Sequence, residues 1–514
     1  MRGALVLGLG ESGLAMTRWL AREGWQVRVA DTREDPPMRA ALASQLPDVE
    51  LRTGPFEPTA LEGVELLAIS PGLAPQHPPA APLVAAARRA KMPVVGEIEL
   101  FARALAVLRA ERGYQPRLIG VTGTNGKTTT TRLAGKMVQA CGLDAAVAGN
   151  IAPCALDVLA ARLDAGRLPE VWVLELSSFQ LETTTSLACH AGAILNISED
   201  HLDWHDSMAH YAQAKRRLLV RGTVAVLNRS DPAVMELAPP AARLSSFGPD
   251  APVRSGEFGL VHDRGIDWLA LAEGPDEPAS RRRPAHPDDA TVFVRRLMPT
   301  DALQIHGRHN ALNAMAALAL ARAVGCPLGP MLQALRQYRG EAHRTERVAV
   351  KAGVEYYDDS KATNVGATLA AIEGLARPGR KLVVILGGDG KQQRFAPLAA
   401  AVGAHARAAI LIGRDAPLIG QALQGIAVPI ESAATLPEAV SRASALAVAG
   451  DAVLLSPACA SFDMFRNYAH RAEVFVRAVQ ELGDRPTSAV AGAGDPAAGA
   501  GQGGEPSAAR APCT

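Results

Sequence analysis

The chain has 514 residues, of which 48% are hydrophobic and 20% charged, and its formal net charge at pH 7 is +1. This length allows roughly three domains with well-packed cores. So balanced a charge argues against a nucleic-acid-binding or membrane-surface protein. No run of about 18 apolar residues predicts a membrane span, and the start of the chain lacks a signal-peptide cleavage site. Six cysteines without a Cys-x-x-Cys pair fit reduced thiols in a cytoplasmic protein.

The first predicted elements form a nucleotide-binding pattern. A strand at 5–7 leads into the glycine-rich turn 8–13, then a helix over 14–22 and a strand at 27–30 that ends in Asp31. This is the dinucleotide fingerprint, with phosphate near the turn and ribose near the acid. A nicotinamide cofactor and any other nucleotide diphosphate both remain open. A later strand, 66–69, ends in Ser70-Pro71-Gly72, which is either a second ligand turn or a plain tight turn.

The segment 120–131 reads Gly-Val-Thr-Gly-Thr-Asn-Gly-Lys-Thr-Thr-Thr-Thr, between an apolar strand and a helix. Backbone N–H groups at the helix start favour phosphate there. Lys127 would reach the terminal phosphates, and Thr128 would ligate magnesium. A Walker loop has glycine where Val121 stands, so we interpret this as a variant P-loop. The alternative is a glycine-rich turn with an incidental Lys-Thr pair.

Two further strand ends carry acids. The strand 171–174 ends in Glu175, and an acid at a strand end beside a P-loop commonly holds magnesium. Alternatively, Glu175 caps the next helix. After the strand 193–196, His201 stands among three acidic residues as a candidate ligand or orienting group. By pattern alone Lys215 is a solvated helix lysine.

Strands are expected next at 223–228 and 244–247, and then 273–289 lacks periodicity and predicts a surface insertion. A helix over 311–324 follows, with Asn310 as the expected N-cap.

The last part repeats the alternation of strand and helix. Its strands share one property, a polar or glycine-rich loop at the carboxyl end, and together these loops would form one rim of a parallel sheet. The strands are expected at 354–357, 381–386, 409–412 and 452–455. From residue 485 the chain is mainly Ala, Gly, Pro and Ser, which predicts a disordered tail over 485–514.

Four motifs closely resemble the Mur ligases, namely Thr122–Thr129, Glu175–Gln180, Asn196–Asp203 and His306–Asn310. The resemblance covers about residues 3–480. It implies an α/β fold of three domains: a Rossmann-like domain for a UDP-linked substrate at 1–94, a central P-loop ATPase-type parallel sheet with helices at 95–300, and a Rossmann-like ligase domain at 301–484. The family consists of ATP-dependent amide-forming enzymes of cytoplasmic peptidoglycan precursor synthesis.

The motifs at 358–364, 386–391 and 456–463 look like those of the D-glutamate-adding branch of the family. The resemblance therefore implies two small-molecule substrates, UDP-N-acetylmuramoyl-L-alanine and D-glutamate, with ATP and two Mg²⁺ ions as cofactors. We expect a monomer without nucleic-acid partners or membrane insertion. One departure is Tyr468, where the family often has phenylalanine.

The resemblance also implies residue roles. The UDP-linked substrate would be bound by Ser12, Asp31, Thr32, Arg33, Ser70, Gly72 and Asn150. ATP would be bound by Gly123, Thr124, Asn125, Gly126, Lys127, Thr128, Thr129, Asn310, Asn313, Arg344 and Asp359. The catalytic group would comprise Lys127, Glu175, His201 and Lys215, with metal held by Thr128, Glu175, His201 and a carbamylated Lys215. D-Glutamate would be bound by Lys361, Thr363, Lys391, Ser461 and Phe462.

Overall fold

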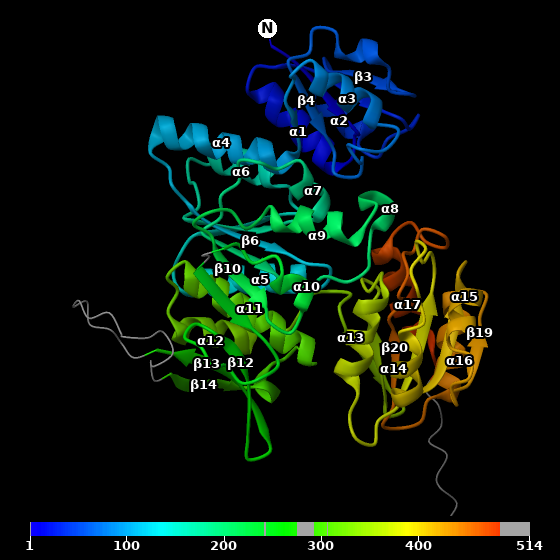
Figure 1. The fold of residues 1–514 in the computed structure, drawn as a ribbon. Coiled ribbons are helices and arrows are strands. Elements are labelled where there is room, and N and C mark those ends of the chain that lie inside the picture. The colour runs from blue at the N-terminus through cyan, green and yellow to red at the C-terminus, as the bar shows by residue number, and fades with distance from the viewer. Residues whose placement is uncertain (1, 241–242, 275–291, 306, 484–514) are drawn as a thin grey trace, which may run out of the picture.

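The computed structural model describes residues 2–240, 243–274, 292–305 and 307–483. Three α/β units follow one another along the chain, each built on its own sheet (Figure 1). This confirms the predicted fold class. Nearly all of the expected insertion, and the expected tail, lie outside the described residues. No helix among those residues has the length and apolar character needed to cross a membrane.

The N-terminal domain is a five-stranded parallel sheet in the order β3-β2-β1-β4-β5. The order reverses between β1 and β4, and in open α/β sheets ligands bind at such a switch point. The strands are β1 (Gly3–Leu7), β2 (Gln26–Asp31), β3 (Glu50–Thr53), β4 (Leu66–Ile69) and β5 (Val94–Val95). The helices are α1 (Glu11–Arg22), α2 (Arg39–Gln45) and α3 (Ala81–Arg89).

Helix α4 (Glu97–Arg112) joins the first two domains. Trp19 of α1, Phe101 of α4 and Trp172 of the central sheet belong to one buried apolar cluster, and the rings of Phe101 and Trp172 meet edge to face at 4.8 Å. The N-terminal domain is therefore anchored on the central one by a shared core.

The central domain has a nine-stranded sheet in the order β14-β13-β12-β11-β10-β9-β6-β8-β7, antiparallel only where β13 pairs with β12 and β14. Its strands are β6 (Arg117–Thr122), β7 (Ala145–Gly149), β8 (Val171–Glu175), β9 (Ala191–Ile194), β10 (Val224–Asn228), β11 (Arg243–Phe247), β12 (Phe258–Asp263), β13 (Ile266–Glu273) and β14 (Phe293–Pro299). Its helices are α5 (Lys127–Ala140), α6 (Ala155–Asp164), α7 (Ser178–Glu182), α8 (Leu202–His205), α9 (Met208–Arg216), α10 (Pro232–Met235), α11 (Arg308–Ala323) and α12 (Leu328–Gln337).

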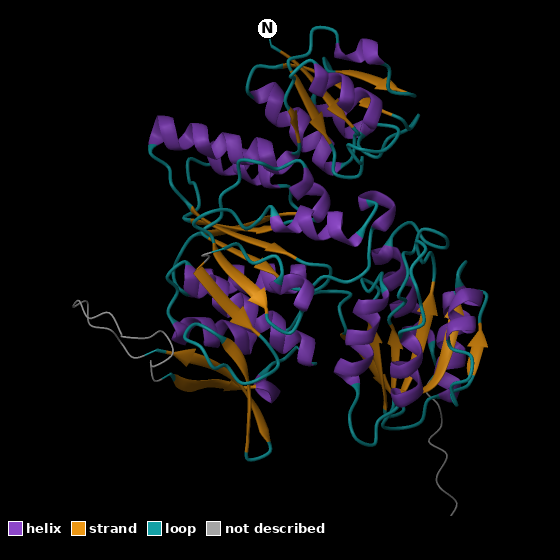
Figure 2. Cartoon of the chain, viewed as in Figure 1, coloured by secondary structure: helices purple, strands orange, loops and turns teal. Residues whose placement is uncertain are grey.

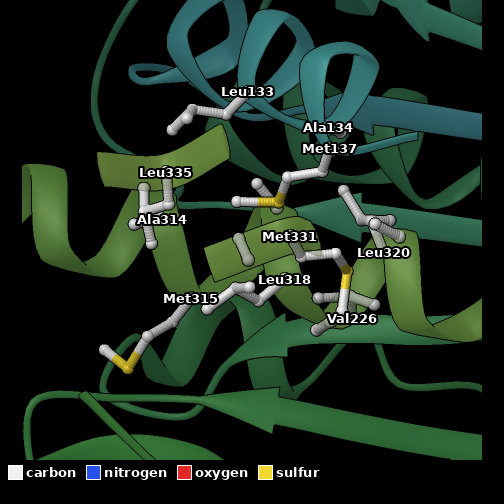
Figure 3. Packing of buried hydrophobic residues seen from close by; sticks show 14 of the residues in the cluster. Leu133, Ala134, Met137, Val226, Ala314, Met315, Leu318, Leu320, Met331 and Leu335 are labelled. Carbon is white, nitrogen blue, oxygen red and sulfur yellow. The ribbon is translucent and has the colours of Figure 1, made fainter. Parts of the chain in front are cut away.

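Helices α11 and α12 pack on α5, although the sequence assigned residues after 300 to the last domain. Figure 3 shows Met137 of α5 among side chains of α11 and α12, all in one buried cluster. These contacts favour a central domain that continues through α12. Helix α11 also begins earlier than expected, with Gly307 as N-cap at φ 96°. The expectation that Asn310 caps this helix is therefore wrong, because Asn310 lies in its first turn.

The C-terminal domain has a six-stranded sheet in the order β15-β16-β20-β17-β18-β19, parallel except for the β15–β16 hairpin (Figure 2). Its strands are β15 (Glu346–Lys351), β16 (Val354–Asp358), β17 (Leu382–Gly387), β18 (Ala406–Ile412), β19 (Ile430–Ser432) and β20 (Ala452–Leu455). Its helices are α13 (Val365–Leu375), α14 (Leu398–His405), α15 (Ala416–Ala422), α16 (Leu436–Leu446) and α17 (Tyr468–Glu481). The four predicted strands are confirmed as β16, β17, β18 and β20.

Candidate active site

The segment predicted as a P-loop joins β6 to α5 and is shaped by glycines at positive φ, 154° at Gly123 and 81° at Gly126. Lys127 begins α5, and its Nζ donates to the carbonyl oxygens of Gly123 at 2.9 Å and Thr124 at 2.8 Å. Burial lowers the pKa of Lys127, against the opposing charges of nearby acids. The loop thus presents a cation at a helix N-terminus, which suits a phosphate group.

Gly126 has a steric reason to be glycine as well as a conformational one. A Cβ at this position would lie 2.3 Å from Oδ1 of Asn313, which comes from α11. Asn313 in turn donates to Oδ1 of Asn310 at 3.2 Å. The two α11 residues assigned to ATP therefore lie against the P-loop.

Asn196, two residues after the end of β9, holds the P-loop by hydrogen bonds to its backbone. Its Oδ1 accepts from the backbone N–H of Asn125 at 2.7 Å, and its Nδ2 donates to the Asn125 carbonyl at 3.1 Å. Sequence reasoning included Asn196 in a motif but gave it no role. Its position at the end of the predicted strand 193–196 was the available signal.

Lys215 of α9 is buried with 1% of its surface exposed. Its Nζ donates to the Gly123 carbonyl at 3.0 Å and lies 4.2 Å from the ring centroid of Tyr211. The pattern-based prediction of a solvated lysine is therefore wrong. Burial, reinforced by repulsion from Lys127, holds the pKa of Lys215 well below its ordinary value.

Glu175 ends β8 and is buried with 2% exposure. Its Oε1 accepts from Nδ2 of Asn150 at 2.8 Å, whereas its Oε2 is buried without a hydrogen-bond partner among the described atoms. The next helix, α7, is capped by Ser177 and Gln180 in a capping box, so the alternative that Glu175 is the cap is wrong. A buried carboxylate oxygen without a partner fits a hard cation such as magnesium.

His201 lies in left-handed backbone at φ 55°, with its Nε2 3.5 Å from Oδ2 of Asp200. Burial lowers the pKa of His201, and the charge of Asp200 opposes this shift. Asp200 is 8% exposed, and sequence reasoning assigned it no role.

A compact group of three histidine and acidic side chains exists within the described ranges at a different place, near the start of the C-terminal domain. Its ligand atoms lie within 4.8 Å of one another, and it consists of His343, Glu346 and Asp358. Neither Glu175 nor His201 belongs to that group.

A cavity of about 330 Å³ opens between the P-loop and the C-terminal domain. The residues assigned to ATP that line it come from four separate segments, and Lys361 lines it with them. They are Asn125, Gly126, Thr129, Asn310, Asn313, Arg344 and Asp359.

Two of these side chains make hydrogen bonds that connect the segments lining the cavity. Arg344 donates from Nη2 to the Thr128 hydroxyl at 2.7 Å across the domain boundary. Asp359 accepts from the Ser456 hydroxyl at 2.7 Å and from the backbone N–H of Thr345 at 3.0 Å. Burial raises the pKa of Asp359 to about 7.

The residues assigned to D-glutamate lie on the rim after β16, β17 and β20. Nζ of Lys361 lies 3.7 Å from the ring centroid of Tyr468, and burial lowers the pKa of Lys361 to about 8. A backbone bridge between Asp389 and Ala460 holds the loop of Lys391 against the loop of Ser461. Thr363 is half-buried. The Phe462 side chain is 73% exposed, so the structure does not close it over the rim.

Arg471 of α17 holds this rim together and was not found from the sequence. It is buried, and it donates to the hydroxyl of Ser360 at 2.9 Å and to the carbonyl of Cys459 at 3.1 Å. An arginine within a helix pattern carries no signal that distinguishes it from a solvated one.

A separate cavity of about 520 Å³ lies at the switch point of the N-terminal domain. It is lined by six of the residues assigned to the UDP-linked substrate, namely Ser12, Asp31, Thr32, Arg33, Ser70 and Gly72. Asn150 is not among them, because it lies beside Glu175 in the central domain. Burial would raise the pKa of Asp31, but hydrogen bonds from Arg33 and the Leu9 N–H outweigh it and lower that pKa.

The chain matches family models in three consecutive stretches. Residues 2–96 match the Mur ligase MurD-like N-terminal domain, residues 121–321 the Mur ligase middle domain, and residues 343–459 the Mur ligase glutamate ligase domain. A UDP-N-acetylmuramoylalanine–D-glutamate ligase of Ralstonia nicotianae is 57% identical over 486 residues, which cover 93% of this chain and 96% of the relative.

Solved structures share the fold at lower identity. UDP-N-acetylmuramate-alanine ligase MurC of Thermotoga maritima is 20% identical with a TM-score of 0.55, over 93% of this chain and 99% of that one. The folylpolyglutamate synthase of Mycobacterium tuberculosis, complexed with ADP, is 19% identical with a TM-score of 0.54, over 74% and 95% of the two chains. From the family models and the high identity to the Ralstonia enzyme, the chain belongs to the Mur ligase family.

Proposed function

We propose that this chain is an ATP-dependent ligase that joins D-glutamate to UDP-N-acetylmuramoyl-L-alanine in cytoplasmic peptidoglycan precursor synthesis. One observation carries the proposal: Lys361 of the last domain lines the same cavity as Asn125 and Gly126 of the P-loop. An amino-acid site and a phosphate site at one interface are what an activating ligase requires. The Ralstonia relative, 57% identical over nearly its whole length, is named for the same reaction.

The reaction must activate a carboxylate, which is a poor acyl donor. The γ-phosphoryl group of ATP passes to the carboxylate of the L-alanyl end, giving an acyl phosphate and ADP. The amine of D-glutamate then attacks the carbonyl carbon, so that the C–N bond forms, the C–O bond to phosphate breaks and the amine loses a proton. Phosphoryl transfer of this kind depends mainly on positioning and charge stabilisation.

The chain supplies both the positioning and the charge stabilisation. The N–H groups at the start of α5 and the ammonium group of Lys127 would hold the terminal phosphates. Magnesium, when bound, neutralises charge on the transferring phosphoryl group. Thr128, Glu175 and His201 would hold it, and the unpartnered Oε2 of Glu175 is the atom that fits this role most directly. Asn150, hydrogen-bonded to that carboxylate, would orient it.

We also propose that Lys215 is carbamylated. Only a neutral amine reacts with carbon dioxide, and burial, which holds the pKa of Lys215 well below its ordinary value, increases the share of that form. The resulting carboxylate would face Lys127 and a bound cation, which would offset its burial. Carbon-13 NMR of the protein in labelled bicarbonate should show one carbamate signal that disappears in Lys215→Arg. A spectrum without that signal would rule the modification out.

D-Glutamate carries two carboxylates, and the rim offers two ammonium groups, Lys361 and Lys391. The half-buried Thr363 and the buried Ser461 hydroxyl would accompany them. Phe462, which is exposed here, would have to move to contact the amino acid. The UDP end of the other substrate would occupy the N-terminal cavity, with Arg33 facing its phosphates.

The decisive experiment measures phosphate release with ATP, magnesium and UDP-N-acetylmuramoyl-L-alanine against a panel of amino acids. We expect stimulation by D-glutamate and formation of one amide per phosphate. Phosphate release without an amide would indicate a hydrolase or kinase. Stimulation by another amino acid would retain the family and change the substrate.

A further inference from the structure

Asn364 is the N-cap of α13 in the C-terminal domain and is 5% exposed. Its Oδ1 accepts from the backbone N–H of Ala367 at 2.9 Å, which is ordinary N-capping. The same amide also reaches across the domain boundary to Asn125 of the P-loop and to Asp200 in the loop between β9 and α8, which we call the acidic loop. Capping alone requires none of these cross-domain contacts.

The two asparagines form a reciprocal amide pair. Nδ2 of Asn364 donates to Oδ1 of Asn125 at 3.1 Å, and Nδ2 of Asn125 donates to Oδ1 of Asn364 at 3.2 Å. The second hydrogen of Asn364 Nδ2 is donated to Oδ2 of Asp200 at 3.1 Å. A carboxamide has two donor hydrogens and two acceptor positions, and all four at Asn364 are in use. A carboxylate has no donor hydrogen and a hydroxyl has only one.

Its partners belong to the reacting part of the site. Asn125 lies in the P-loop, where Asn196 fixes its backbone. The charge of Asp200 acts on both Lys127 and Lys215. Asn364, a residue of the last domain, is thus hydrogen-bonded to both the P-loop and the acidic loop.

Gly366 shows independently that α13 packs closely against the P-loop. A Cβ at Gly366 would lie 3.2 Å from Nδ2 of Asn125 and 3.4 Å from the Ser198 hydroxyl. The first turn of α13 therefore lies so close to the P-loop that a methyl group at Gly366 would have to displace the Asn125 side chain by a few tenths of an ångström, although alanine would be the better helix former there.

We propose that Asn364, with Asn125 and Asp200, is a latch that fastens the C-terminal domain onto the P-loop while the acyl phosphate exists. The inference rests on the proposed ligase function. With the latch formed, Lys361 faces the P-loop across one cavity and water is kept from the intermediate. Without it the domain spends more time apart from the loop, and water competes with the amine for the acyl phosphate. Asn364 is a positioning residue, because it acts through its partners.

Asn364→Asp is the sharpest test, because aspartate has nearly the same shape and is an equally good N-cap. It removes both donor hydrogens and places a carboxylate beside Asp200. We expect kcat to fall on the order of 10- to 100-fold, the effect of losing a hydrogen bond to a charged partner. The amide formed per phosphate released should also fall below the wild-type ratio, while the KM for the UDP-linked substrate stays unchanged.

Two variants separate the latch from helix stability. Thr435→Ala removes the N-cap of α16 in the same domain, where Thr435 Oγ1 accepts from the N–H of Glu438 at 3.3 Å. It should lower the melting temperature and leave kcat and the product ratio unchanged. Gly366→Ala should preserve or raise the melting temperature and still lower the amide formed per phosphate.

A double-mutant cycle with Asn125→Ala tests the pairing itself. If the two asparagines act through one contact, kcat of the double variant is no lower than that of the slower single variant. A double variant whose loss in kcat equals the product of the two single losses contradicts the pairing.

Small-angle scattering in the presence of ADP tests the latch without the amino-acid substrate. We expect a larger radius of gyration for Asn364→Asp than for wild type. Equal radii, or wild-type kcat and product ratio in Asn364→Asp, overturn the proposal. A wild-type enzyme that ignores D-glutamate overturns only the proposed substrate.

Discussion

At the scale of single residues, two glycines with nearly the same φ allow the effect of backbone strain to be distinguished from that of a steric contact. Gly126 has φ 81° and Gly142, just after α5, has φ 82°. A Cβ at Gly142 would meet nothing within 4 Å, whereas at Gly126 it would meet Oδ1 of Asn313 at 2.3 Å. Alanine would therefore have the same conformational cost at both positions. Only at Gly126 would it also collide with Asn313, a residue that lines the nucleotide cavity.

Alanine at Gly142 should lower the free energy of unfolding by about 1 kcal/mol, the cost of a side chain in left-handed backbone, and alanine at Gly126 should lower it further because of the collision with Asn313. Only Gly126→Ala should also abolish ATP-dependent phosphate release, because Asn313 must move away from the P-loop. Thermal melts and phosphate assays on the two variants make the comparison. Equal loss of activity in Gly142→Ala would show that strain in α5, not the contact with Asn313, is responsible.

Lys127→Ala should abolish turnover and leave uridine nucleotide binding intact, since the N-terminal cavity is lined by residues of the first domain alone. Lys136 is the matched control, because it lies on the same helix with its side chain exposed. Lys136→Ala should keep full turnover. Calorimetry with UMP and a phosphate assay measure the two properties, and loss of UMP binding in a folded Lys127→Ala would contradict separate sites.

At the scale of elements, the sequence predicted strands and the loops after them well, and burial on helices poorly. The strand before Glu175 is a continuous apolar run, and its end is marked by a polar residue, so both strand and acid could be found. Lys215 and Arg471 lie on amphipathic helices, where one lysine or arginine looks like any other. Their burial depends on what packs against α9 and α17, which are the Gly123 carbonyl and the loop of Ser360. Only tertiary structure supplies those partners.

Helix α4 carries two buried acids whose charges affect stability in opposite directions. Glu97 is 1% exposed, its Oε1 accepts from the N–H of Leu156 at 2.8 Å, and its Oε2 is buried without a partner among the described atoms. Burial raises the pKa of Glu97 to about 7. Glu99 is also buried, but hydrogen bonds from the Thr185 and Ser186 N–H groups and Arg103 outweigh burial and lower its pKa.

The two acids predict opposite pH effects. Between the unfolded pKa near 4.5 and about 7, folded Glu97 keeps a proton that the unfolded chain has lost, so stability falls as pH rises. The loss by pH 8 is about 3 kcal/mol. Glu97→Gln should therefore gain stability over wild type as pH rises from 5 to 8. Glu99→Gln should lose stability at neutral pH and approach wild type below pH 4. Urea unfolding of both variants against pH checks this, and parallel curves would contradict it.

For the whole molecule, the central domain is joined to its two neighbours by different kinds of contact. The N-terminal domain shares an apolar cluster with it through α4. The C-terminal domain on the other side is joined to it by hydrogen bonds such as that from Arg344 to Thr128. Apolar burial holds domains in a fixed arrangement, whereas a polar interface that can exchange its bonds with water suits a domain that opens and closes. The first interface is therefore expected to stay together and the second to respond to nucleotide.

Two nucleotides should accordingly protect different parts of the chain from hydrogen exchange. ADP should slow exchange in the P-loop and also in segments 340–345 and 359–371, because its cavity is lined from both domains. UMP should slow exchange only around 8–12, 31–33, 56 and 70–73, which line the first cavity. Arg33→Ala, at that cavity, should lose the UMP effect and retain the ADP effect. Protection by ADP confined to the central domain would mean that the last domain does not contribute to the nucleotide site. The interface between these two domains would then have to form independently of nucleotide binding.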